Sequence, residues 1–123
     1  MPPLILLVDG DADQHQIVGD FLSYQGYEVA HASSYADADR QSTIRIPGFI
    51  IAEWNLPDSW GGDGVRRLVA AERLLRVPII VCTADAVTNP TRLARFAGVR
   101  MWCVKPCTPT AVYEIVRGIV PTE

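Results

Sequence analysis

The sequence predicts a doubly wound α/β domain, in which helices cover both faces of a parallel sheet. Two observations favour this fold class. Apolar runs of strand length alternate with segments whose apolar residues recur at helical spacing. The chain also has 123 residues, of which 49% are hydrophobic and 20% charged, so it can bury one core and is too apolar to be disordered. We therefore expect residues 1–123 to form a single domain.

The first half of the chain supplies three predicted strands and two predicted helices. The strands are expected at residues 4–8, 27–31 and 49–52. Asp13, with Gln16 three positions later, is typical of a capping box, so a helix is expected to begin there with Ile17 on its buried face. Gly26 is a stop signal for this helix, and a weaker, alanine-rich helix is expected after Ser34.

The second half of the chain repeats the alternation. Strands are expected at residues 78–82 and 101–104. The helix before the first of these strands is expected to bury Leu75. Asn89 is expected to cap the next helix, which buries Phe96, and Thr108 to cap the last, because each capping residue is followed by a first-turn proline. The prediction is therefore five strands and five helices in strict alternation.

Side chains that carry chemistry stand at the ends of four of the predicted strands. They are Asp9, Glu53, Thr83 and Lys105. Lys105 is the only lysine of the chain, since every other cation is arginine, which sets it apart from ordinary surface charge. Open parallel sheets place their sites at the carboxyl edge, so we expect these four residues to converge there. This is the layout of a phosphoryl-transfer pocket, but its central acid is a glutamate.

Composition and charge exclude several classes of function. A formal charge of -3 and a pI near 5.3 give no reason to expect nucleic-acid binding. No apolar stretch approaches the roughly 20 residues of a membrane span, and the N-terminus lacks a signal-peptide pattern, so we expect a cytoplasmic protein. His15 and His31 have no nucleophile or acid partner in the sequence and are expected to be structural or exposed.

The three cysteines fit the same compartment. Cys82 and Cys103 lie in apolar runs, and an odd number of cysteines argues against a disulfide framework. Cys103 and Cys107 have no nearby histidine and lack zinc-site spacing. Buried, inert thiols are therefore expected, with a redox role as the alternative.

Four groups of residues, in order and at five-strand spacing, resemble the receiver domain of bacterial response regulators. They are Val8-Asp9-Gly10-Asp11, Glu53-Trp54-Asn55-Leu56-Pro57 with Asp63-Gly64, Thr83-Ala84, and Lys105-Pro106. The resemblance covers nearly the whole chain, and Glu53-Trp54-Asn55 is particularly similar to the single-domain chemotaxis receiver, which carries aspartate in the first place. It implies a flavodoxin-like (βα)5 three-layer sandwich with a five-stranded parallel sheet in the order 2-1-3-4-5. It also implies a cis peptide before Pro106 and a role in bacterial two-component phosphorelay signalling, not in enzymatic catalysis.

The resemblance also implies a role for each residue of the pocket. In the family, an aspartate after the third strand takes a phosphoryl group from a histidine kinase, and an acidic pair after the first strand helps it to hold Mg²⁺. By resemblance, Glu53 stands at the phosphoacceptor position, Asp9 and Asp11 are the acids of the pocket, Asn55 offers a carbonyl to the metal, Thr83 and Lys105 contact phosphoryl oxygens, and Trp102 is the switch aromatic.

Two positions depart from the family pattern. Gly10 stands where the second acid would ligate the metal directly, and Glu53 carries the central carboxylate one methylene, roughly 1.5 Å, farther out. Mg²⁺ demands well-placed oxygen ligands and a misplacement near 1 Å can cost on the order of a hundredfold in rate, so we expect no cofactor and no efficient phosphorylation. Glu53 is expected either to mimic phosphate, by reaching Lys105 and Thr83, or to form a structural ion pair with Lys105 in a receiver that no longer switches.

Other residues around the site supply the alternatives. If the degenerate site still binds Mg²⁺, a residual phosphoacceptor would be Asp58, Asp11 or Glu53. Trp54 and Trp60 flank the site and are the candidates for a lid. Packing on the adjoining helix is the competing interpretation for Trp54. Trp60, in a loop longer than the family's, is expected to close over the pocket or to anchor a partner.

The expected partners are signalling proteins, either a histidine kinase or a downstream effector. The surface of the fourth helix, fifth strand and fifth helix is expected to contact them, and would also serve a homodimer. This surface includes Arg92, Arg95, Trp102, Tyr113 and Arg117.

Overall fold

The computed structural model describes residues 2–85 and 89–122, and within them one five-stranded sheet forms the centre of the molecule. The strands are β1 (Leu4–Val8), β2 (Glu28–Ala32), β3 (Phe49–Ala52), β4 (Ile79–Thr83) and β5 (Met101–Val104). All neighbouring strands are parallel, and their order is β2-β1-β3-β4-β5. The predicted fold class and strand order are confirmed. The peptide bond before Pro106 is cis, as the resemblance implied.

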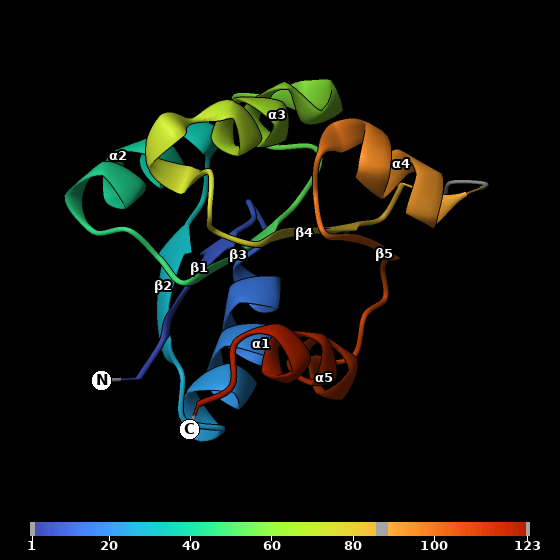
Figure 1. Cartoon of the computed structure of the whole chain (residues 1–123). Helices are drawn as coiled ribbons and strands as arrows, with labels where there is room; N and C mark the ends of the chain where they lie inside the picture. Colours follow the sequence, from blue (N-terminus) through green and yellow to red (C-terminus); the bar gives the residue numbers. More distant parts are fainter. Residues whose placement is uncertain (1, 86–88, 123) are drawn as a thin grey trace.

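Helices cover both faces of the sheet (Figure 1). They are α1 (Ala12–Tyr24), α2 (Tyr35–Ile44), α3 (Asp63–Ala70), α4 (Pro90–Ala97) and α5 (Pro109–Ile119), with 3₁₀ turns at Trp60–Gly62 and Glu72–Leu74. Helices α1 and α5 lie on one face, and α2, α3 and α4 lie on the other (Figure 1). None of the helices in the described ranges is both long and apolar enough to span a membrane.

Each face of the sheet has its own apolar core, because successive side chains of a strand point to opposite faces. In β1, Leu6 and Val8 pack with residues of α2, α3 and α4, whereas Ile5 and Leu7 pack with residues of α1 and α5. All residues of β1 are buried, as expected for a central strand that is covered on both sides. The two cores hold the strands in register and so fix where the strand ends lie.

The structure corrects the predicted start of α1 and confirms two other helix starts. Asp11, not Asp13, is the N-cap of α1: its carboxylate accepts a hydrogen bond from the Asp13 backbone N–H at 2.9 Å. Asn89 and Thr108 cap α4 and α5 as predicted. The carboxylate of Asp11, expected in the acidic pocket, is therefore engaged at a helix end.

Three apolar side chains that were predicted to be buried are exposed. Ile17 is 57% exposed, Leu75 66% and Phe96 75%. The reason at Leu75 is that α3 ends at Ala70 and the 3₁₀ turn after it changes the helical phase, so that Leu74 enters the core instead. On α4 the buried positions are alanines, so Phe96 falls on the outer side of a narrow apolar stripe.

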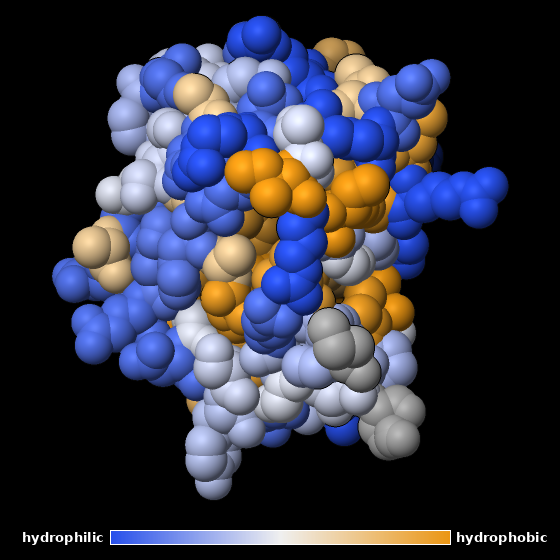
Figure 2. Space-filling view, turned by 90° about the vertical axis from the view of Figure 1, so that its left-hand side faces the viewer, coloured by the Kyte–Doolittle hydropathy of each residue, from blue (hydrophilic) through white to orange (hydrophobic). Residues whose placement is uncertain are grey.

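The β2 edge of the sheet carries an apolar hollow (Figure 2). Its volume is about 220 Å³, and it is lined by Leu4, Leu6, Glu28, Ala30, Gln41, Ile44, Arg45 and Pro47. The guanidinium of Arg45 donates two hydrogen bonds, of 2.6 and 2.7 Å, to the carboxylate of Glu28. The charged groups at this hollow therefore pair with each other, at the edge of the sheet opposite to β5.

Candidate functional site

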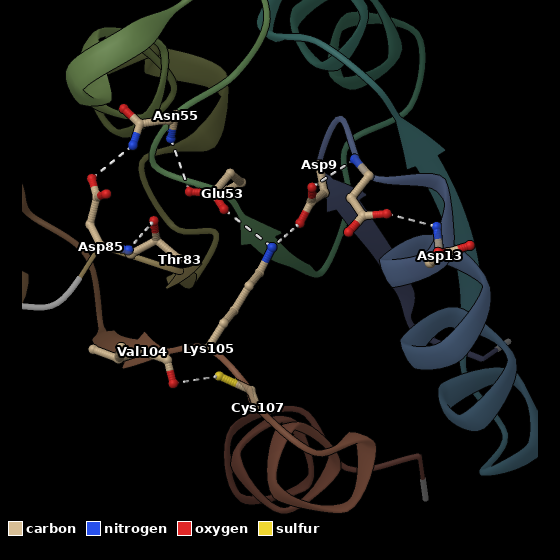
Figure 3. Close-up of polar contacts among 10 residues, drawn as sticks. Asp9, Asp13, Glu53, Asn55, Thr83, Asp85, Val104, Lys105 and Cys107 are labelled. Atoms are coloured by element: carbon tan, nitrogen blue, oxygen red, sulfur yellow. Dashed lines mark hydrogen bonds and ion pairs between the residues drawn. The ribbon is translucent and has the colours of Figure 1, made fainter.

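Four strand ends bring the predicted polar residues to one edge of the sheet. Asp9 and Glu53 follow β1 and β3, Thr83 ends β4, and Lys105 follows β5. Backbone hydrogen bonds extend the sheet to these residues: the Glu53 N–H donates to the Val8 carbonyl at 2.8 Å, and the Lys105 N–H donates to the Thr83 carbonyl at 2.7 Å. Their backbones are therefore anchored by the sheet, and the side chains of Asp9, Glu53 and Lys105 meet above it (Figure 3).

Lys105 joins the two carboxylates, and we call Asp9, Glu53 and Lys105 the oxygen pocket. The Lys105 Nζ lies 2.7 Å from Asp9 Oδ2 and 3.2 Å from Glu53 Oε1 (Figure 3). The exposed fraction of these side chains is 18% for Lys105, 7% for Asp9 and 12% for Glu53. The expected contact between Glu53 and Lys105 is thus present, in surroundings where charge-assisted hydrogen bonds are strong.

Every carboxylate oxygen of the oxygen pocket accepts a hydrogen bond. Asp9 Oδ1 accepts from the Asp11 N–H at 2.9 Å, Glu53 Oε2 accepts from the Asn55 N–H at 3.0 Å, and Lys105 donates to the other two oxygens. Burial alone would lower the pKa of Lys105, but hydrogen bonding and charge from Asp9, followed by those from Glu53, raise that pKa above its ordinary value. The ammonium therefore stays protonated and neutralises one of two neighbouring negative charges.

The hydroxyl of Thr83 does not join this cluster. Thr83 is 1% exposed, and its Oγ1 accepts a hydrogen bond from the Asp85 N–H at 3.3 Å. Among the described residues, no hydrogen bond connects Thr83 with Glu53. The expectation that Glu53 reaches both Lys105 and Thr83 is therefore met only at Lys105.

A second polar contact at this edge was not predicted from the sequence. Asn55 Nδ2 donates to Asp85 Oδ2 at 2.7 Å (Figure 3). Asn55 Oδ1 accepts from the Gly61 N–H at 2.8 Å. The side chain of Asn55 thereby ties the loop before α3 to the loop before α4. Asp85 lies two residues after Thr83, so the sequence could have placed it at this edge, but nothing in the pattern pointed to Asn55 as its partner.

The residues of the oxygen pocket differ in two ways from the ligand set expected of a Mg²⁺ site. Gly10 contributes no carboxylate, and a Cβ built there would lie 3.1 Å from Pro57 Cγ, so the proline would have to give way to a larger residue. All four oxygens of Asp9 and Glu53 already accept hydrogen bonds, and the Lys105 ammonium stands between the two groups. Mg²⁺ prefers a near-octahedral set of oxygen ligands at about 2.0–2.1 Å, and the carboxylates of this pocket are those of Asp9 and Glu53.

The two other acids that the sequence suggested as phosphoacceptors hold helix ends. Asp11 caps α1 through the Asp13 N–H. Asp58 accepts hydrogen bonds from the Tyr35 N–H at 2.8 Å and the Ala36 N–H at 3.0 Å, at the start of α2. These backbone hydrogen bonds, that of Ala36 first, lower the pKa of Asp58. Both carboxylates therefore accept hydrogen bonds from backbone N–H groups at helix starts.

The three tryptophans differ in how far they are buried. The rings of Trp54 and Trp102 lie 4.7 Å apart between centroids, with their planes inclined by 56°. Trp102 is 6% exposed, and its indole N–H has no hydrogen-bond acceptor within the described residues. Trp54 is half-buried and lies under the guanidinium of Arg66, whereas Trp60 is 77% exposed. Trp54 therefore packs instead of covering the pocket, and Trp60 is in solvent.

A basic groove runs along α4 toward the starts of β4 and β5. Its volume is about 610 Å³, and its lining includes Arg76, Arg95, Arg100, Met101 and Trp102. The exposed Phe96 also lies on α4. The groove overlaps the surface that the sequence suggested for protein contacts at Arg95, whereas Trp102, which was expected on that surface, is buried.

Comparison with known proteins gives a consistent answer. The model of the response regulator receiver domain family matches residues 5–117. Chemotaxis protein CheY1 of Helicobacter pylori strain J99 is 30% identical over 124 residues, which cover 97% of this chain and 98% of that protein.

Solved structures agree with the sequence comparison. Chemotaxis response regulator CheY4 of Vibrio cholerae superposes with a TM-score of 0.87 at 22% identity, covering 98% of this chain and all of that one. The receiver domain of sensor histidine kinase PA1611 from Pseudomonas aeruginosa, solved with a magnesium ion coordinated in its active site cleft, gives a TM-score of 0.83 at 25% identity, covering 97% and 98%.

Proposed function

This chain belongs to the family of response regulator receiver domains, and we propose that it signals in one fixed state, set by the ion pair of Glu53 and Lys105 instead of a transferred phosphoryl group. Receiver domains are signalling modules of two-component systems. In this proposal the state of the domain does not depend on phosphorylation, and the domain signals through contacts with partner proteins.

The observation that carries the proposal is the complete pairing within the oxygen pocket. The Lys105 ammonium lies 2.7 Å from Asp9 Oδ2 and 3.2 Å from Glu53 Oε1, and backbone N–H groups occupy the remaining two oxygens. The ammonium already supplies positive charge to both carboxylates, as a metal would. Removing one partner of a buried ion pair typically costs about 3–5 kcal/mol, because the other charge is left unpaired, so these carboxylates are expected to keep the ammonium as their cation.

We propose that Glu53 is a partial mimic of a phosphorylated residue. It engages the cation that would hold a phosphoryl oxygen, but not the hydroxyl of Thr83. Its charge is about one unit, where phosphate would carry about 1.5 to 2. The inward packing of Trp102 on Trp54 supports a single state of the domain, because the ring at the switch position is held in the core. The purely structural ion pair is the competing interpretation.

Exposure to a small phosphodonor with Mg²⁺, followed by intact-mass measurement, tests the proposal. We expect no mass increase of one phosphoryl group for the natural chain. The matched control is the double variant Gly10→Asp, Glu53→Asp, which restores both acids of the family pattern and is expected to gain the phosphoryl group once Pro57 adjusts. Stoichiometric phosphorylation of the natural chain would overturn the proposal in favour of a residual phosphoacceptor.

Glu53→Gln separates the mimic from the structural pair. The substitution keeps the shape of the side chain and removes its charge, and it is expected to cost about 1–3 kcal/mol through the lost charge-assisted hydrogen bond. If Glu53 sets the signalling state, the NMR signals of the Trp102 indole and of α4 shift as well. Changes confined to the immediate neighbours of residue 53 would favour the structural pair.

We further propose that the face of α4, β5 and α5 makes the partner contacts. The basic groove with Arg95 and Arg100, next to the exposed Phe96, supports an acidic partner surface with an apolar centre. A histidine kinase, a downstream effector and a second copy of the chain are the occupants proposed for it, in the cytoplasm. Charge reversal of Arg95 is expected to abolish binding to an effector of this kind in a pull-down with the cognate signalling proteins.

A further inference from the structure

The three cysteines of the chain lie together on the face of the sheet that carries α1 and α5, and we call them the thiol cluster. The Sγ atoms of Cys82, Cys103 and Cys107 all lie within 4.8 Å of one another. Cys82 belongs to β4, Cys103 is its partner in the register of β5, and Cys107 follows β5. Only Cys82 is fully buried, while Cys103 and Cys107 are partly exposed, which corrects the expectation of buried thiols.

We propose that the thiol cluster is a binding site for a thiophilic metal ion, Zn²⁺ by its ligand chemistry. Thiolate sulfur binds Zn²⁺ at about 2.3 Å, which places three ligand sulfurs about 4 Å from one another around the ion. The sulfurs of the cluster reach this arrangement with shifts of less than about 1 Å. The sequence alone pointed away from zinc because Cys103 and Cys107 lack the usual spacing, but the third ligand comes from a neighbouring strand.

The charge and exposure of the cluster favour a divalent ion with one open position. Three thiolates carry three negative charges, so Zn²⁺ leaves one of them uncompensated and a monovalent ion would leave two. The ammonium of Lys105, whose charge acts on Cys107, offsets part of the remainder. Cys103 and Cys107 are partly exposed, so water can complete the four ligands that zinc prefers. No fourth protein ligand belongs to the group within the described residues.

Binding exchanges protons for the metal. Each of the three Zn–S bonds replaces an S–H bond and releases one proton to solvent, without oxidation or reduction. The hydrogen bond that Cys107 Sγ makes with the Val104 carbonyl at 3.5 Å is lost with the proton.

The position of the cluster links it to the oxygen pocket. Cys82 directly precedes Thr83, and Cys103 and Cys107 stand two residues before and after Lys105. A metal on these sulfurs would cross-link β4 to the segment that carries the ammonium. Metal binding is therefore expected to reach the oxygen pocket through the backbone of Lys105, although the metal site itself does not depend on the function proposed above.

Titration of the reduced full chain with Cd²⁺, followed by competition with Zn²⁺, tests the site. We expect one Cd²⁺ per chain, a thiolate-to-metal charge-transfer absorption, displacement by Zn²⁺, and a thermal midpoint that rises with Zn²⁺, because the ion binds the folded chain. Cys107→Ser and Cys103→Ser are each expected to weaken binding more than about a hundredfold, beyond the effect of losing an outer-shell partner. His31→Gln is the matched control and should bind as the natural chain does, since its ring stacks on His15 instead of facing the cluster.

Three results would overturn the site. They are absence of the charge-transfer absorption, equal affinity in the cysteine variants whose far-ultraviolet circular dichroism shows the native fold, and displacement of Cd²⁺ by monovalent copper but not by Zn²⁺. A different result would assign the cluster to disulfide formation instead of metal binding. It is an intact mass lower by two hydrogens after exposure to air, together with no metal uptake by the fully reduced chain.

Discussion

The oxygen pocket and the thiol cluster stand on opposite sides of Lys105 and hold different chemistry. In the oxygen pocket, two carboxylates surround a cation that the chain itself supplies, with Nζ–O distances of 2.7 and 3.2 Å. In the thiol cluster, three sulfurs lie within 4.8 Å of one another, and the charge of that same ammonium acts on Cys107. The oxygen pocket has hard oxygen ligands, and the Lys105 ammonium lies between them. The thiol cluster has soft sulfur ligands, and that ammonium does not lie among them.

The difference shows how one residue can serve two sites. The Lys105 ammonium donates hydrogen bonds to Asp9 and Glu53. The hydrogen bond with Cys82, and then the charge of Lys105, lower the pKa of Cys107. The neutralisation of the oxygen pocket and the reactivity of the thiol cluster are therefore expected to depend on the same ammonium. Substitutions at Lys105 therefore test most directly whether the two sites depend on the same ammonium.

The largest effect is expected for Lys105→Met. The variant keeps the aliphatic stem and leaves the carboxylates of Asp9 and Glu53 facing each other in a mostly buried site. The loss in the free energy of unfolding is expected to be about 3–5 kcal/mol, measured by urea denaturation. Adding Glu53→Gln to this variant should recover part of the loss. A loss under about 1 kcal/mol would show that solvent screens the pair.

A second effect is expected in the alkylation of Cys107. Its pKa of about 7 lies below the ordinary thiol value, so the alkylation rate measured against pH should have its midpoint near 7. In Lys105→Met the midpoint should rise, because the ammonium that favours the thiolate is gone. Peptide mapping by mass spectrometry identifies the cysteine that reacts. The same midpoint in both proteins would show that the charge of Lys105 does not affect the ionisation of Cys107.

The smallest effect is expected at the stacked rings of His15 and His31, on α1 and β2. Burial, and then the charge of His15, lower the pKa of His31 below its ordinary value. The unfolded chain therefore takes up this proton first, so stability falls as the pH drops below about 6.5 and levels off below the lowered pKa. The loss should be under about 1 kcal/mol because the side chain is exposed. His31→Gln should remove this dependence, measured by thermal unfolding between pH 7 and 5; an unchanged profile would assign it to another group.

Much of the fold and of the oxygen pocket could be predicted, because strong local signals coincide with strand ends. Polar, capping or turn residues mark the ends of each apolar run. Asp9, Glu53 and Lys105 follow their strands directly. Parallel strands then bring these residues to one edge, whatever the details of helix packing. Register was therefore enough to predict the ion pair of Glu53 with Lys105.

The missed features depend on geometry that a linear pattern does not contain. The carboxylates of Asp11 and Asp58 are held by the first N–H groups of helices, because a cap competes with a pocket for the same acid. Phe96 is exposed because α4 is short and buries only its alanines. The thiol cluster needs both the pairing of β4 with β5 and the path of the chain after Lys105, so the spacing of its cysteines was misleading.

The most direct test uses the fact that Lys105 is the only lysine of the chain. Selective isotope labelling of lysine gives a single side-chain NMR signal, which can be titrated with pH and then with Mg²⁺ and a phosphodonor. We predict a pKa above the ordinary lysine value, which falls in Glu53→Gln, and a signal that millimolar Mg²⁺ and phosphodonor leave in place. A pKa at or below the ordinary value, or a shift of the signal on adding Mg²⁺, would contradict the fixed ion pair.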